Sequence, residues 1–302
     1  MPVIKVEHLT KDYGFGRGVF DVSFAIEKGQ VFGFLGPNGA GKTTTIRHIM
    51  GFSNPDIGTT EVQGLESFEN SQEILKNLGY LPGEIALPEN LTGTQFIKYM
   101  ADMRGIKDMT YTNELVKKFQ LDPSGKLKRM SLGMKRKLAI VTAFMHDPEI
   151  LVLDEPTSGL DPVMQRVFID FICEQKKRGK TILLSSHIFN EVEATCDIIS
   201  IIKDGRVVST CWLDDIKIQK KKTYKIEFAD INEYTKFLTE NLDFVLKSEE
   251  KHQVRISIRD EDINKFIKLV TKYRIKFFAE QKYSLEDYFM RFYEKSEQGV
   301  LV

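Results

Sequence analysis

The sequence predicts an α/β protein with a mostly parallel sheet, a helical insertion and a small C-terminal α+β domain. A glycine-rich loop joins an apolar strand to a helix at residues 31–50. Unbroken apolar runs recur at 150–153 and 182–184, which is typical of strands buried on both faces of a parallel sheet. After residue 213, strand and helix patterns follow the order β-α-β-β-α-β, which is the ferredoxin-like arrangement.

Length and composition indicate two domains and argue against a nucleic-acid partner. The chain has 302 residues, 42% of them hydrophobic, where one domain usually takes about 100–200 residues. Its 43 basic and 43 acidic residues give no net charge, so it lacks the basic excess typical of nucleic-acid-binding proteins. The cysteines, Cys173, Cys196 and Cys211, form no CxxC pair or zinc spacing and indicate reduced thiols in a cytosolic protein.

We expect neither a signal peptide nor a membrane span. The first residues, MPVIKVEHLTKDYG, contain no apolar stretch after the charged positions. The longest apolar runs have the length of buried strands, well short of the roughly 18–20 residues of a spanning helix. If the protein works at a membrane, another chain must cross it.

The loop after the strand at 31–35 has the spacing of a phosphate-binding loop, G-x-x-x-x-G-K-[ST], followed by a helix. Its residues are Gly36, Pro37, Asn38, Gly39, Ala40, Gly41, Lys42 and Thr43, with Thr44 next. Glycines let backbone amides turn toward an anion, and the helix start adds positive potential. We expect Lys42 to reach the terminal phosphates and Thr43 to bind Mg²⁺. The alternative is a glycine-rich turn that merely links strand and helix.

Two adjacent carboxylates, Asp154 and Glu155, follow the apolar run at 150–153. Open α/β sheets place ligands at the C-terminal ends of their strands, and adjacent strand residues point to opposite sides. We therefore expect Asp154 to hold Mg²⁺ and Glu155 to polarise an attacking water. The alternative is an Asp-Glu turn after a core strand.

These motifs, in this order, resemble the ATP-binding subunit of an ABC transporter over roughly residues 3–212. The resemblance implies a P-loop NTPase core that binds ATP and Mg²⁺ and hydrolyses ATP. It assigns Tyr13 to stacking on adenine, where the alternative is a surface tyrosine in a hairpin. It places Asp161 in the loop along the dimer seam and His187 against the γ-phosphate. The GFGRG cluster after Tyr13 is interpreted as a hairpin loop, not a second phosphate site.

The segment RMSLGMKRKL at 129–138 resembles the signature of the same family. The resemblance implies that Ser131 and the Gly133 amide face ATP bound by a second ATPase subunit, in a head-to-tail homodimer. The following cations, Lys135, Arg136 and Lys137, are interpreted as a solvated basic face. The helix is expected to run on and stop at residue 148.

Two positions depart from the family pattern. Gly83, in GYLPGE, stands where the family usually has a glutamine, and Met134 replaces the usual glutamine of the signature. We interpret Glu84 as a partial substitute that reaches the metal or the water, with a water-filled metal shell as the alternative. Both variants resemble a subgroup that drives small export permeases, including bacitracin, lantibiotic, drug and sodium exporters.

We predict an ATPase domain at 1–212, with its helical subdomain at about 82–148, and an accessory domain at 213–302. The resemblance implies that the helical subdomain docks on a membrane permease. Apolar residues expected to be partly exposed there are Leu87, Leu91, Phe96, Tyr99 and Met100. The accessory domain has balanced charges and no catalytic constellation, so it serves stability or dimer contact, or binds a regulatory ligand or partner.

The predicted function is an ATP-hydrolysing subunit that powers export of a drug, peptide antibiotic or ion. It would work through a separate transmembrane permease, as a peripheral protein on the inner face of the cell membrane. One alternative is a soluble ABC-type ATPase acting on a nucleoprotein target. Another is a low-activity regulatory subunit in a heterodimer.

Overall fold

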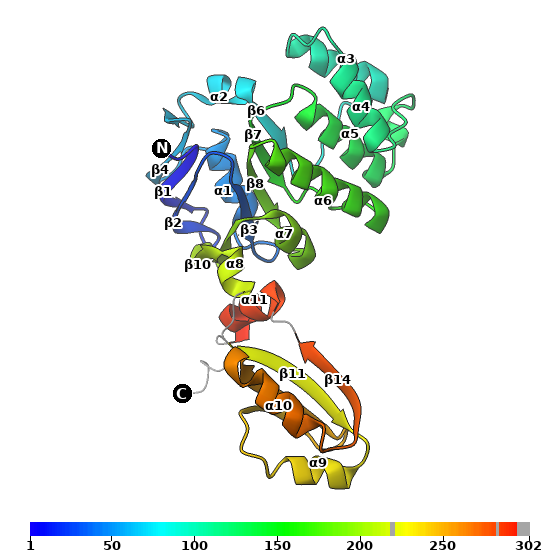
Figure 1. Ribbon diagram of the computed structural model, residues 1–302. Helices are drawn as coiled ribbons and strands as arrows, with labels where there is room; N and C mark the ends of the chain where they lie inside the picture. Colours follow the sequence, from blue (N-terminus) through cyan, green and yellow to red (C-terminus); the bar gives the residue numbers. More distant parts are fainter. Residues whose placement is uncertain (218–220, 282–283, 295–302) are drawn as a thin grey trace. The chain divides into compact units, whose positions relative to one another are not determined.

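The computed structural model describes residues 1–217, 221–281 and 284–294, in two units that divide after Leu213. Figure 1 shows both units, with the chain coloured from blue to red. Among the described residues, no helix combines the length and the apolar character needed to cross a membrane.

The first unit is built on a six-stranded sheet of order β10-β9-β3-β8-β7-β6. Its strands are β3 (Val31–Leu35), β6 (Leu78–Leu81), β7 (Ile150–Asp154), β8 (Thr181–Ser186), β9 (Ile198–Lys203) and β10 (Arg206–Trp212). All neighbours are parallel except β9 and β10. Every residue of β3, β7 and β8 is buried, which explains their mostly apolar character. The predicted parallel core is therefore confirmed.

A second, antiparallel sheet of order β2-β1-β4-β5 precedes this core, and the prediction did not separate it. Its strands are β1 (Ile4–Asp12), β2 (Gly18–Ile26), β4 (Ile57–Val62) and β5 (Leu65–Glu66). The helix α1 (Lys42–Ile49) lies between the two sheets, because its apolar face, with Ile46 and Ile49, joins a core that includes Phe24 and Phe34. The opposite face of β3 packs on α7 (Phe189–Thr195) at Gly33.

The predicted insertion is helical, as expected, and its helices group beside the edge strand β6 (Figure 1). They are α3 (Gly93–Met103), α4 (Thr110–Lys118), the short η1 (Leu127–Arg129) and α5 (Leu132–Phe144). The helix α5 ends at Phe144, before the predicted stop at Pro148, because the chain turns at Asp147 with a φ of +50°. Phe144 packs on Phe171 of α6 (Pro162–Lys177). The remaining helices of this unit and its boundary are α2 (Ser71–Asn77) and α8 (Leu213–Lys217).

The second unit has the predicted ferredoxin-like order. Its elements are β11 (Lys221–Phe228), α9 (Ile231–Phe237), β12 (Phe244–Ser248), β13 (Gln253–Arg259), η2 (Asp260–Asp262), α10 (Ile263–Val270), β14 (Ile275–Gln281) and α11 (Leu285–Glu294). The sheet order is β12-β13-β11-β14, with antiparallel neighbours throughout. Ser284 and Asp287 form the expected reciprocal cap of α11: each side chain accepts the other's backbone N–H, at 3.1 and 2.9 Å.

Candidate nucleotide-binding site

The phosphate-binding loop lies between β3 and α1, as predicted, and leaves the helix start open. Gly41 occupies the N-cap of α1 with a φ of +111°, and no side chain caps the helix. Gly39 has a φ of +82°, a conformation that glycine adopts without strain. Uncapped amides at a helix start attract anions because they carry partial positive charge. The loop is therefore suited to binding phosphate.

Lys42 is held at the centre of this loop. Its side chain is 5% exposed, and its ammonium donates to the carbonyls of Gly36 at 2.7 Å and Pro37 at 3.2 Å. It also lies 3.0 Å from the Glu155 carboxylate. A buried ammonium with these neutral and anionic partners is held in position, as phosphate binding requires.

Asp154 is fully buried at the end of β7 and accepts hydrogen bonds on both oxygens. The Thr43 hydroxyl donates to Oδ2 at 2.7 Å, and the Ser185 hydroxyl donates to Oδ1. A carboxylate beside a threonine hydroxyl is an oxygen-only donor set, which suits Mg²⁺ once phosphate oxygens and water complete the shell. Thr43 and Asp154 therefore fit the predicted metal, although the described residues hold no cluster of three metal-ligating side chains.

Glu155 and His187 meet at the same end of the sheet. The backbone of Glu155 turns into the left-handed region, with a φ of +48°, and its N–H donates to Ser185 O at 3.1 Å. The turned carboxylate lies 2.7 Å from His187 Nδ1 and contacts Lys42 through its other oxygen. Left-handed backbone at a non-glycine residue costs about 1–3 kcal/mol, and such strain clusters at functional sites. The predicted base and switch histidine are therefore brought together.

A cavity of about 350 Å³ opens at the phosphate-binding loop. Its lining includes most of the predicted ATP-binding positions: Tyr13, Asn38, Gly39, Gly41, Lys42, Thr43 and Thr44, together with Glu155. It also includes the GFGRG loop, through Gly16, Arg17 and Gly18, and the turn at Asp204 and Gly205. The sequence reasoning missed these residues. The glycine-arginine composition of the loop was the available signal, since a cation beside a phosphate site is informative.

The predicted signature residues lie outside this cavity. Ser131 caps α5 by accepting the Met134 N–H at 3.2 Å, and it is exposed. Asp161 caps α6 in the same way, accepting the Met164 N–H at 3.0 Å. Ser131, Gly133 and Asp161 are absent from the described lining of the cavity, as are Gly36, Pro37 and Ala40 of the loop itself.

The interpretation of Arg136 as part of a solvated face is wrong. Its side chain is 2% exposed and donates three hydrogen bonds to backbone carbonyls. Its neighbours Lys135 and Lys137 are half-buried. Arg136 is buried because the carbonyls that accept its hydrogen bonds surround it. These carbonyls belong to segments distant in the sequence, so the local sequence pattern does not reveal the burial.

Glu84, the predicted substitute for the missing glutamine, is exposed. Its side chain forms no hydrogen bond or ion pair within the part of the chain that the structure describes, and its proposed metal role stays a prediction. Gly83 lies next to Asp154, since a Cβ at this position would be 3.0 Å from Asp154 Oδ2.

A buried carboxylate, Glu191, contacts Ser186, the residue before the predicted switch histidine. Glu191 of α7 is 1% exposed and accepts the Ser186 hydroxyl at 2.5 Å. Burial raises the pKa of Glu191 to about 7, and the charge of Glu155 adds to the shift, while bonds from Ser186 and Thr157 oppose it.

Comparisons with known proteins agree with this site. Residues 19–158 match the ABC transporter family. The chain is 33% identical to the bacitracin transport ATP-binding protein BcrA of Bacillus licheniformis, over 96% of each chain. It is 38% identical to the ABC transporter ATP-binding protein NatA of Bacillus subtilis, over 64% of this chain and 80% of that one.

Solved structures give the same result. An ATP-binding subunit of an ABC transporter superposes with a TM-score of 0.65, at 33% identity, over 71% of this chain and 92% of that one. The dimeric ABC transporter cassette MJ0796 superposes with a TM-score of 0.63 over 70% and 98% of the two chains, and its 23% identity supports the fold alone. The chain belongs to the ABC transporter family, as one of its ATP-binding subunits.

Proposed function

We propose that this subunit binds ATP with Mg²⁺ and hydrolyses it to drive export through a separate membrane permease. The observation that carries the proposal is the line of contacts from Lys42 through Glu155 to His187 at the phosphate-binding loop. These three side chains supply a cation for phosphate, a base for water and a group that holds the base. Their presence favours an active ATPase over a low-activity regulatory subunit.

The residues divide the chemistry of hydrolysis among them. A triphosphate at the loop would compete with Glu155 for the Lys42 ammonium and free the carboxylate to accept a proton from the attacking water. His187 would orient that carboxylate through its 2.7 Å contact and face the γ-phosphate. Thr43 and Asp154 would hold Mg²⁺, which would neutralise charge on the phosphate oxygens.

The signature supports a shared site between two copies. Ser131 and Gly133 start a helix whose amides suit an anion, yet they do not line the cavity of their own phosphate-binding loop. A second copy that presents these residues to the γ-phosphate would complete each site. The MJ0796 cassette, which has the same fold, is described as dimeric.

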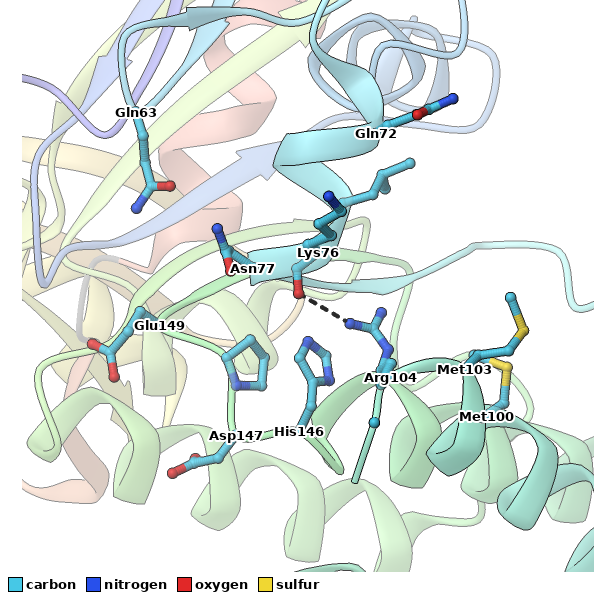
Figure 2. A pocket seen from close by; sticks show the side chains of 13 residues that line it. Gln63, Gln72, Lys76, Asn77, Met100, Met103, Arg104, His146, Asp147 and Glu149 are labelled. Atoms are coloured by element: carbon cyan, nitrogen blue, oxygen red, sulfur yellow. Dashed lines mark hydrogen bonds between the residues drawn. The ribbon is translucent and has the colours of Figure 1, made fainter. Parts of the chain in front are cut away.

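The helix α3 is the proposed permease-docking face. Of the five apolar residues predicted to be partly exposed in the helical subdomain, Phe96, Tyr99 and Met100 lie on α3. Tyr99 is 53% exposed, and the other four of the five are partly buried. Met103, one turn further along, is 68% exposed. Figure 2 shows that Met100, Met103 and Arg104 line one side of a cavity of about 970 Å³, opposite Gln72 and Lys76 of α2. The exposed Met103 and the partly buried Met100 beside this cavity are adaptable apolar contacts for a partner helix.

The class of cargo is inferred from relatives. BcrA is named for bacitracin transport, and YbhF of Escherichia coli K12, 34% identical over 72% of this chain and 38% of that protein, is named a probable multidrug ATP-binding protein. Together with the Gly83 and Met134 variants, these names support export of a drug, peptide antibiotic or ion. The proposed location is the inner face of the cell membrane.

The variant Glu155→Gln tests the proposed hydrolysis. The amide keeps the shape of the side chain but cannot take a proton, so turnover of ATP should fall by about 10²–10⁴. With ATP and Mg²⁺ the variant should accumulate as a dimer in size-exclusion chromatography, while the wild type with ADP stays monomeric. A variant that hydrolyses ATP at the wild-type rate and remains monomeric would refute Glu155 as the base.

A further inference from the structure

Arg136 is a buried cation in α5 to which the proposed function gives no role. Its guanidinium donates from Nε to the Ser158 carbonyl at 2.9 Å, from Nη1 to Pro82 at 2.9 Å and from Nη2 to Gly83 at 2.6 Å. One planar guanidinium can serve three carbonyls in fixed directions, whereas an ammonium cannot reproduce this geometry. Arg136 therefore joins the signature helix to two other segments of the chain.

The first of these segments touches the aspartate proposed to hold Mg²⁺. A Cβ on Gly83 would lie 3.0 Å from Asp154 Oδ2 and 3.2 Å from its Cγ, so only bare backbone fits there without displacement. The same Oδ2 accepts the Thr43 hydroxyl. The Gly83 backbone, held by Arg136, is therefore one wall of the site around Asp154.

The second segment is the turn that follows the proposed base. The Ser158 N–H donates to the Glu155 carbonyl at 3.1 Å, which closes this turn. The next residue, Gly159, approaches the start of α5, since its carbonyl would lie 3.0 Å from a Cβ on Gly133. The helix α5 thus contacts the turn twice, through Arg136 and through Gly133.

The charge of Arg136 is also relevant to the site. Burial lowers the pKa of Arg136, while the negative charges of Asp154 and Glu155 raise it. The three hydrogen bonds go to neutral carbonyls, and none goes to either carboxylate. The cation therefore acts on both carboxylates through its field while leaving their oxygens available for other contacts.

We propose that Arg136 is a positioning residue that links the signature of this chain to the carboxylates of its own ATP site. The helix α5 would present Ser131 and Gly133 to the partner's nucleotide. Through Arg136 the same helix holds the Gly83 backbone next to Asp154 and holds Ser158 in the turn after Glu155. The role of the glutamine that is missing at position 83 would then be taken by the Gly83 backbone, which Arg136 of α5 holds in place, and not by Glu84. This inference rests on the proposed function, because it concerns hydrolysis at a site shared by two copies.

Arg136→Lys and Gly83→Ala test the link from its two ends, with Lys135→Gln and Lys137→Gln as matched controls on the same helix. The lysine of Arg136→Lys keeps the positive charge but cannot donate to three carbonyls as the planar guanidinium does. The Cβ of Gly83→Ala comes close to Asp154 and leaves Arg136 unchanged. Each should lower kcat by about 10–100-fold, the effect typical of losing a group that orients a site, with unchanged affinity of the monomer for ADP. In the Glu155→Gln background, each should also raise the ATP concentration needed for dimers. The control variants should keep wild-type values.

A double-mutant cycle makes the test decisive. If both changes break one link, the double variant should lose little more kcat than the worse single variant, since coupled residues are non-additive. Wild-type kcat in either single variant, fully additive losses, or a loss of ADP affinity as large as the loss of kcat would overturn the proposal. ATP hydrolysis by the wild type and dimer trapping by Glu155→Gln remain separate readouts, so failure of the link is distinguishable from failure of the proposed function.

Discussion

At the residue scale, the site depends on side chains whose roles follow from their partners. Lys42, Asp154 and Glu155 were predicted from motif spacing, because a phosphate-binding loop and a strand-end carboxylate pair need particular residue types at fixed positions. The contact of Lys42 with Glu155 and that of Asp154 with Thr43 agree with those roles. Arg136 could not be predicted in the same way, since its partner carbonyls lie 22 and 54 residues away in the sequence.

Tyr13 gives a residue-scale prediction about nucleotide affinity. It lines the cavity at the phosphate-binding loop and is 51% exposed, so its ring is available to stack on a base and its removal leaves the core intact. Tyr13→Ala should weaken ADP binding by about 1–3 kcal/mol, or roughly 5–150-fold in Kd. Tyr13→Trp, which keeps an aromatic face, should bind nearly as well as the wild type. Isothermal titration calorimetry with ADP measures both, and equal affinity of the alanine variant would exclude stacking.

At the scale of elements, the apolar strands and the loop between β3 and α1 were predictable because their patterns are local. The antiparallel sheet was not, since the strand β4 alternates only partly and pairs with β1, some fifty residues earlier in the chain. The strand β5 has two residues, too few for any periodic signal. The predicted hairpin around GFGRG is present, but its position beside the phosphate-binding loop depends on how the two sheets pack around α1.

The link between α7 and β8 gives an element-scale prediction about pH. The pKa of Glu191 is raised to about 7 in the folded protein, against an ordinary value of 4.5. Between these values the unfolded chain loses a proton that the folded protein keeps, so this group stabilises the fold at low pH and the contribution is lost as pH rises toward 7. The substitution Glu191→Gln removes this contribution to the pH dependence of the free energy of unfolding. Relative to the wild type, the variant should gain about 1.4 kcal/mol in free energy of unfolding per pH unit within this window.

Urea unfolding at several pH values measures the difference, followed by the fluorescence of the single tryptophan, Trp212, in the first unit. The pH dependence of stability has the opposite sign for His146. Burial, together with the charge of Arg104, lowers the pKa of His146 to about 4, so its protonation in the unfolded chain destabilises the fold as pH falls below 6.5. His146 is present in both proteins and cancels in the comparison. A stability difference that stays flat from pH 4.5 to 7 would contradict the assignment for Glu191.

At the scale of the whole molecule, the account requires two copies. One chain presents the phosphate-binding loop and the proposed base, Glu155, at one cavity, but its signature residues lie outside that cavity. The position of this helix start outside the cavity is explained if it faces a nucleotide bound by a second chain. The family membership of the chain agrees with this arrangement, and the ATP-bound dimer remains the central claim.

Mixing two inactive variants tests this claim most directly. Lys42→Ala destroys the phosphate-binding loop but leaves the signature, whereas Ser131→Arg blocks the signature but leaves the loop. Each variant alone should fail to hydrolyse ATP. If every site combines a loop from one copy with a signature from the other, the mixture should recover part of the wild-type activity, because each mixed dimer contains one intact site. A mixture as inactive as its separate components, or full activity of Ser131→Arg alone, would contradict the account.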